Sequence, residues 1–191
     1  MNDLRRIEAF LEAKSAETGA SQNTLSAYAR DLADFHEFLI DQKQDLMQVD
    51  MAGVEAYLVD LVNRDLSQST RARRLSAIKQ FFHFCLEENW RADHPALQIT
   101  GPGRGKSLPK TMTVIDVDRL MDCAITTAKG AVERARNACL MQVLYATGMR
   151  VSELMSLPVA ACRGEPEFLL IKGKGGKERI VPLSPPASAA L

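Results

Sequence analysis

The order of apolar and polar positions predicts a helical front half. Apolar side chains recur every three or four residues in four successive segments, which is the spacing of an amphipathic helix. The segments start near residue 3, after Ser21, after Asp50 and after Ser67 or Ser69, with short polar stretches between them. Ser and Asp are favoured N-caps, because their side chains accept hydrogen bonds from free backbone N–H groups. The pattern therefore predicts a bundle of four helices.

The same spacing predicts the core of this bundle. Each helix carries one wide apolar face, which we expect to pack against the other three. The residues on these faces are Leu4, Ile7, Phe10, Leu11, Tyr28, Leu32, Phe35, Phe38, Leu39, Val54, Tyr57, Leu58, Leu61, Val62, Leu75, Ile78, Phe81, Phe82 and Leu86.

The pattern changes after residue 94. Three prolines, three glycines and three cations fall within residues 95–110, with few large apolar side chains. Such a composition predicts an extended linker. We therefore divide the chain into a helical domain over 1–94, a linker over 95–111 and a second domain over 112–191.

The second domain is predicted to be mixed. Thr113 is a suitable N-cap for one helix, a second covers about 134–147, and a short third follows. From residue 167 the apolar spacing becomes strand-like, with EFLLI and RIVPL on either side of a glycine-rich turn. Ser184 and the two prolines after it indicate another helix start. We expect this domain to be unfinished at residue 191.

Composition narrows the classes of protein. No apolar stretch approaches the roughly 18 residues of a membrane span, and the N-terminus lacks a signal-peptide pattern, which indicates a cytoplasmic protein. The four cysteines form no CxxC pair and are expected to be buried or incidental thiols. With only three scattered histidines, we expect no metal site.

Charge is balanced overall but unevenly distributed. Residues 1–66 contain six Lys or Arg and thirteen Asp or Glu, whereas residues 67–110 contain eight and three. A polyanion responds to the local field and not to the total charge. The segment 67–110 is therefore the candidate surface for nucleic acid.

The fourth helix begins with a cluster of arginines, Arg71, Arg73 and Arg74. Arginines at a helix N-terminus oppose the helix dipole, which prefers acids there. The cluster is either a solvated charged face or a binding site for an external anion, and its place in the basic segment favours the anion. The polar residues just before it, Gln68, Ser69 and Thr70, suit contacts with phosphates or base edges.

Two further stretches indicate phosphate binding. In LYATGMRVSEL, Gly148 ends one helix, and Arg150 lies two residues later at a tight junction between helices, with Glu153 three residues on. Arg150 either caps the helix carbonyls or presents a rigid guanidinium to a phosphate. In IKGKGGKERIVPL, the turn carries four cations, Lys172, Lys174, Lys177 and Arg179, against one acid.

Together these blocks resemble the tyrosine recombinase family of the lambda-integrase type. ATGMRVSEL followed by GKGGKERIVPL is similar to its catalytic domain, and SQNTLSAYARDLADFHEFL and STRARRLSAIKQFFHF are similar to its core-binding domain. The chain looks nearest to the XerC/XerD branch, which resolves chromosome dimers. The resemblance implies a mainly α fold, a SAM-like helical core-binding domain followed by the first part of an α/β catalytic domain with a small antiparallel sheet.

The resemblance also implies an activity. These enzymes cut DNA with a tyrosine, form a 3′-phosphotyrosyl intermediate and rejoin the strands as tetramers of like or unlike subunits, without metal or cofactor. Arg150 matches the first catalytic arginine, Glu153 its acidic companion and Lys174 the lysine that protonates the leaving 5′-oxygen. The expected contacts to double-stranded DNA are Gln68, Ser69, Thr70, Arg71, Arg73, Arg74, Lys79, Lys106, Lys110, Lys172, Lys177 and Arg179.

One departure from the family limits this interpretation. The family's remaining catalytic residues and its nucleophile follow the hairpin, whereas the last tyrosine here is Tyr145, for which the resemblance implies a packing role. We therefore expect the 191 residues to be an inactive, truncated form that binds DNA near the nucleoid. The alternatives are a natural non-catalytic short form, the integrase of a mobile element, or a helical transcription regulator, which would leave Arg150 and Lys174 unexplained.

Overall fold

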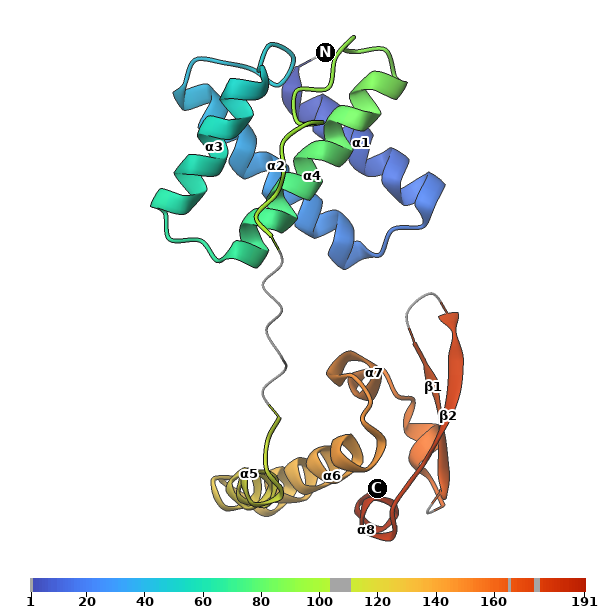
Figure 1. The fold of residues 1–191 in the computed structure, drawn as a ribbon. Helices are drawn as coiled ribbons and strands as arrows, with labels where there is room; N and C mark the ends of the chain where they lie inside the picture. The colour runs from blue at the N-terminus through green and yellow to red at the C-terminus, as the bar shows by residue number, and fades with distance from the viewer. Residues whose placement is uncertain (1, 104–110, 165, 174–175) are drawn as a thin grey trace. The chain divides into compact units, whose positions relative to one another are not determined.

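The structure is a computed structural model that describes residues 2–103, 111–164, 166–173 and 176–191. The described residues fall into two compact units, one up to residue 103 and one from residue 111 (Figure 1). Lys106, Lys110 and Lys174, three of the residues expected to act on DNA, lie outside the described residues.

The first unit is the predicted four-helix bundle (Figure 1). Its helices are α1 (Asp3–Thr18), α2 (Gln22–Asp41), α3 (Met51–Asn63) and α4 (Gln68–Glu87). Side-chain caps start them as expected, because Ser21, Asp50 and Ser67 each accept a hydrogen bond from a backbone N–H three residues on. Of the two candidates for the fourth cap, Ser67 is the one used.

Aromatic side chains dominate the core of the first unit. Phe10, Phe35, Tyr57, Phe81 and Phe82 are fully buried and pack edge-on or tilted against one another. Each brings a large apolar area out of water, which is the main stabilising contribution to folding.

Two of the expected core positions are wrong. Leu4 and Val62 are exposed. Both lie at the edge of their helix's apolar face, where a regular spacing continues past the neighbouring helices.

The predicted linker begins inside the first unit. Ala96 is fully buried and Ile99 nearly so, and both belong to the bundle core. His94 contributes a contact between its Nε2 and the carbonyl oxygen of Lys79 at 3.1 Å. Small apolar side chains among prolines and glycines therefore pack onto α4, although the composition of the segment resembles that of a free linker.

The second unit combines two longer helices, several short ones and a hairpin (Figure 1). A capping box between Thr113 and Asp116 starts α5 (Val114–Thr126), and α6 (Ala131–Thr147) packs against both α5 and α8. The remaining elements are α7 (Val151–Met155), the 3₁₀ turn η1 (Val159–Cys162), β1 (Phe168–Lys172), β2 (Glu178–Pro182) and α8 (Pro185–Ala190).

The hairpin packs its inner face on a small core. β1 and β2 pair antiparallel with Ile171 opposite Arg179. Leu169 and Ile171 point inward and pack with Val143 and Met149, all four being buried. Because side chains alternate across a strand, the same register places Arg179 on the inner face of β2.

Candidate functional site

The junction of α6 and α7 fixes the position of Arg150. Gly148 adopts the left-handed conformation with φ 59°, and its N–H donates to the carbonyl of Leu144, which ends α6. Met149 then enters the core, and Arg150 becomes the N-cap of α7. The buried residue before it and the helix start after it leave the Arg150 backbone little freedom.

Glu153 holds Arg150 from within α7. Its Oε2 accepts a hydrogen bond from the Arg150 backbone N–H at 2.8 Å, and its Oε1 accepts one from Arg150 Nη1 at 2.9 Å. The Glu153 side chain is only 5% exposed, whereas that of Arg150 is 69% exposed. The carboxylate is therefore internal, and most of the Arg150 guanidinium faces solvent.

Arg179 binds the same carboxylate from the hairpin. Its Nη1 and Nη2 donate to Glu153 Oε1 and Oε2 at 2.9 and 2.8 Å, a bidentate pair. These bonds, followed by the bond from the Arg150 backbone, lower the pKa of Glu153 from 4.5 to about 2. The same pair raises the pKa of Arg179. Glu153 is thus an anion at neutral pH, shared by two arginines.

The glycine at the end of β1 lets the hairpin approach this cluster. The Gly173 N–H donates to the carbonyl of Lys177 at 2.7 Å, which closes the described part of the turn. A β-carbon on Gly173 would lie 3.4 Å from both Glu153 Oε1 and Arg179 Nη1. Gly173, the last described residue before the tip, therefore lies beside the Glu153 carboxylate.

The outer face of the hairpin is exposed and mixed, because the apolar Phe168, Leu170 and Ile180 lie on it beside Lys172 and Glu178. Lys172 pairs with Glu178 across the strands at 3.4 Å, and both side chains are well exposed. Lys177 is exposed as well. Arg179 differs from these expected DNA contacts, because its two terminal nitrogens are already bound to Glu153.

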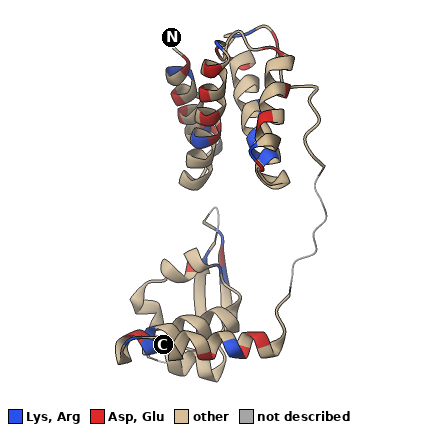
Figure 2. Ribbon diagram, turned by 90° about the vertical axis from the view of Figure 1, so that its left-hand side faces the viewer, with Lys and Arg blue, Asp and Glu red and all other residues tan. Residues whose placement is uncertain are grey.

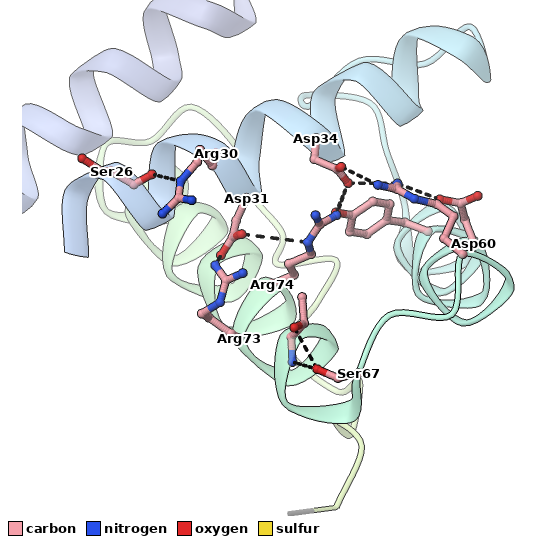
Figure 3. Close-up of polar contacts among 11 residues, drawn as sticks. Ser26, Arg30, Asp31, Asp34, Asp60, Ser67, Arg73 and Arg74 are labelled. Atoms are coloured by element: carbon pink, nitrogen blue, oxygen red, sulfur yellow. Dashed lines mark hydrogen bonds and ion pairs between the residues drawn. The ribbon is translucent and has the colours of Figure 1, made fainter. Parts of the chain in front are cut away.

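The arginines of α4 have internal partners that the sequence interpretation did not include. Arg73 pairs with Asp31 and Arg74 with Asp34, and both carboxylates lie on α2 (Figure 3). Arg74 also donates to the Tyr57 hydroxyl at 3.0 Å, and its side chain is only 14% exposed. Arg74 is thus mainly a bridge between helices, while Arg73, 49% exposed, keeps one side in solvent.

Asp34 is the centre of this network. It accepts from Arg74, from the Tyr57 hydroxyl at 2.7 Å and from Arg64 Nη2 at 2.7 Å, and Arg64 also reaches Asp60 (Figure 3). Burial opposes ionisation of Asp34, but the bonds from Arg64 and Tyr57 outweigh it and lower its pKa. Burial and the bond to Asp34 raise the pKa of Tyr57. Figure 2 shows acidic and basic residues side by side on the helices of this unit.

Two of the other expected contacts on α4 line a hollow. Gln68 and Ser69 are exposed and line a cavity of about 1070 Å³ together with Asp31, Arg73 and residues of α2. Gln68 donates to the carbonyl of Gly103, Thr70 bonds to Ser67, and Lys79 donates to the carbonyl of Leu97 at 3.2 Å. Arg71 is half-buried, and its Nε has no hydrogen-bond partner among the described residues.

Two other expectations concern single residues. Tyr145 is 61% exposed, so it does not pack into the core of the described residues, although the resemblance implied a packing role for it. Cys85 is buried, which raises its pKa to about 12, while Cys139 and Cys162 are partly buried and Cys123 is exposed.

Within the described ranges, no cluster of three His, Cys, Asp or Glu residues could hold a metal ion. No helix among these residues has the length and apolar character to cross a membrane.

The sequence interpretation missed the acidic half of both clusters. Asp31 and Asp34 lie three residues apart, at the spacing of one helix face, and their partners are the adjacent Arg73 and Arg74. The two acids on one face of α2 were a usable signal that this face packs against a basic one. No signal of this kind links Arg179 to Glu153, because their contact depends on how the hairpin packs against α7.

Comparison with known families covers most of the chain. Residues 7–89 match the phage integrase N-terminal SAM-like domain, and residues 110–191 match the phage integrase family. Tyrosine recombinase XerD of Caulobacter vibrioides is 44% identical over 184 residues, covering 96% of this chain and 60% of that protein. XerD of Agrobacterium fabrum is 47% identical over 193 residues, covering 99% of this chain and 58% of its own length. The chain thus spans about three fifths of the length of these curated relatives.

Solved structures share the fold. A lambda integrase dimer bound to a COC′ core site superposes with a TM-score of 0.73 at 15% identity, covering 93% of this chain and 47% of that one. XerH recombinase bound to difH, in a pre-cleavage complex, gives a TM-score of 0.70 at 22% identity, covering 95% and 65%. These matches confirm the expected fold class, a helical N-terminal domain followed by the start of a mixed domain with a small antiparallel sheet.

Proposed function

The chain belongs to the phage integrase family of tyrosine recombinases, as its sequence resemblance predicted, and from this we propose that it serves site-specific DNA recombination of the XerD type. The reaction is the transfer of a DNA phosphoryl group to a tyrosine and back to a DNA hydroxyl. The covalent intermediate conserves the bond energy, so the reaction needs no external energy source.

The observation that carries this proposal is the geometry of Arg150. In-line displacement at phosphorus builds charge on the non-bridging oxygens, and a preorganised cation stabilises that charge best when it need not move during the reaction. Arg150 has a fixed backbone at a helix junction, a buried carboxylate behind it and a guanidinium that is 69% exposed. It is therefore suited to bind a phosphate as the substrate reaches its transition state.

The hairpin supplies the second part of the proposed site. Lys174 follows Gly173, which lies next to the Glu153 carboxylate, and we assign it the proton transfer to the leaving 5′-oxygen. Lys172 and Lys177 are exposed on the same hairpin and suited to phosphate contacts. In the first unit, the proposed contacts to duplex DNA are Gln68, Ser69 and Arg73, which line the hollow, together with Thr70 and Arg71 beside them on α4.

The wider role remains part of the proposal. Its supports are the XerD relatives, together with neighbours whose structures are a dimer and a tetramer of lambda integrase on DNA. We propose that the protein acts in the cytoplasm, at the chromosome, within a recombinase tetramer, and that it resolves chromosome dimers for partition at cell division. Integration of a mobile element is the other reaction that the same site would serve.

For the 191-residue polypeptide itself, we propose DNA binding without strand cleavage. Its last tyrosine is Tyr145, which lies on α6 before Arg150, whereas the family's nucleophile follows the hairpin. A nicked suicide substrate tests this directly, since a cleaving protein remains covalently bound to it. We expect no covalent complex, and a band that survives denaturation would contradict the proposal.

The binding part is tested by Arg150→Gln on a mixed-sequence 30-base-pair duplex. Affinity decreases with salt, and the magnitude of the log–log slope is smaller by about 0.9 when the protein neutralises one phosphate fewer. We therefore expect Arg150→Gln to reduce the magnitude of this slope by about 0.9. The matched control is Arg136→Gln, which removes an exposed arginine of α6 in the same unit. An unchanged slope for Arg150→Gln, or an equal decrease for the control, would refute the role assigned to Arg150.

A further inference from the structure

Glu153, Arg150 and Arg179 form a group with an excess of one positive charge. The three residues come from α7, its N-cap and β2. Their side-chain exposures rise from 5% for Glu153 to 39% for Arg179 and 69% for Arg150. The negative charge is thus internal, and the most exposed member is a cation.

The two arginines bind the carboxylate unequally. Arg179 donates from both terminal nitrogens to both oxygens, at 2.9 and 2.8 Å. The Arg150 side chain donates once, at 2.9 Å, and its second bond to Glu153 comes from the backbone. A bidentate pair is the stronger and more directional arrangement. Arg179 is therefore the principal counter-ion of Glu153, and most Arg150 donors remain available.

We infer that Arg179 is a positioning residue that compensates Glu153, so that Glu153 can hold Arg150 in place without cancelling its charge. This inference rests on the proposed function, in which Arg150 binds a DNA phosphate. A carboxylate behind an arginine orients it but also weakens its attraction for a phosphate. The second arginine removes that conflict, since the group keeps one net positive charge at its exposed end.

The hairpin packing makes this role specific to Arg179. Ile171 lies opposite Arg179 in the register and is buried in the core, so Arg179 is held on the inner face of β2. Gly173 lies close enough that its added β-carbon would contact both Arg179 Nη1 and Glu153 Oε1 at 3.4 Å. The Arg179–Glu153 pair therefore also joins the strand next to the tip to the helix that carries Arg150.

The inference predicts an unusual rescue in DNA binding. In Arg179→Gln, the charge of Glu153 neutralises Arg150. We therefore expect the magnitude of the slope of log affinity against log salt on the 30-base-pair duplex to decrease by about 0.9, as for Arg150→Gln. Adding Glu153→Gln removes the carboxylate charge while a glutamine can still cap α7. The double variant should therefore return to the slope of the unsubstituted protein. Arg179→Lys, which keeps the charge, should reduce the slope less than Arg179→Gln does, and Arg136→Gln should leave it unchanged.

The outcomes separate the possible roles. If the double variant binds as weakly as Arg179→Gln, then Arg179 contacts DNA itself or is needed for folding, and the inference is overturned. An unchanged slope in Arg179→Gln overturns it as well. If Arg150→Gln has no effect, the proposed function of Arg150 fails, whatever Arg179 does.

A second measurement tests the charge compensation without DNA. Carbon-13 NMR titration of the Glu153 carboxyl group reports its pKa directly. Within the described residues, the charged groups that face this carboxylate are Arg150 from the start of α7 and Arg179 from β2. We expect Arg179→Gln to raise the pKa of Glu153 clearly and Arg179→Lys to raise it less. A pKa that does not change would overturn the inference even if the proposed function holds.

Discussion

The two charged clusters of this molecule use arginine in opposite ways. In the first unit, Arg64, Arg73 and Arg74 face three carboxylates, those of Asp31, Asp34 and Asp60. In the second, Arg150 and Arg179 share the single carboxylate of Glu153. The first cluster is neutral and the second keeps a positive charge. A count of arginines along a sequence therefore overestimates the charge that a phosphate can use, and what matters is how many acids face them.

Burial separates the clusters as well. Asp34 and Arg74 connect α2 with α4 and reach the Tyr57 hydroxyl of α3, so their bonds hold three helices in register. Among the described residues, the Arg150 side chain pairs with Glu153 of the adjoining helix α7, and it is mostly in solvent. The first cluster should therefore affect mainly stability, and the second mainly ligand binding.

The largest effect is expected from Asp34→Ala. It removes the shared acceptor of Arg74, Arg64 and Tyr57 and leaves a largely buried guanidinium without its main partner. Breaking such a pair by removing one partner costs about 3 kcal/mol. Urea unfolding of the first unit, followed by circular dichroism, measures this change in the free energy of unfolding.

Asp60→Ala is the matched control for that variant. The Asp60 carboxylate pairs with Arg64 at 3.2 Å, and both side chains are partly exposed. Exposed pairs of this kind contribute about 0.5 kcal/mol. Similar decreases in the two variants would mean that Asp34 is not the centre of the network.

A smaller effect is expected when the pH is lowered, and it concerns the stability of the second unit. Its source is Glu153, whose pKa falls from 4.5 to about 2 on folding. A lowered pKa contributes stability above pH 4.5, and that contribution disappears as the pH falls from 4.5 to 2. Unfolding midpoints at pH 6 and pH 3 should therefore differ less in Glu153→Gln than in the original protein. An equal acid sensitivity would show that the carboxylate is not the group that titrates.

The smallest effect is expected at the outer face of the hairpin. Lys172 and Glu178 pair at 3.4 Å, with side chains that are both well exposed. Water and salt screen such a pair, so Glu178→Gln should change the free energy of unfolding by less than about 0.5 kcal/mol. A decrease comparable with that from Asp34→Ala would break the distinction between buried and exposed pairs.

Much of the fold was predictable from local rules. Helix starts followed from the side chains that cap them, and Ser21, Asp50, Ser67 and Thr113 all act as expected. The strand-like spacing of apolar positions also predicted the two strands of the hairpin. The exposed Leu4 and Val62 show where the rule ends, because periodicity does not indicate how far a neighbouring helix extends.

The site was predictable only in part. Gly148 placed Arg150 at a helix end, and the three-residue spacing to Glu153 predicted their contact. The bonds of Arg179 were not predictable, because they join residues 26 positions apart on the hairpin and on α7. Such contacts depend on tertiary packing, which decides which cations keep their charge for a ligand.

The burial of Ala96 and Ile99 decides where the first unit can be separated from the rest of the chain. A polypeptide that stops at residue 94 ends after the last helix of the bundle but lacks two side chains of its core. One that continues to residue 103 keeps both. The boundary of this unit as an independently folding domain therefore lies after Ile99, several residues beyond the point where its regular secondary structure ends.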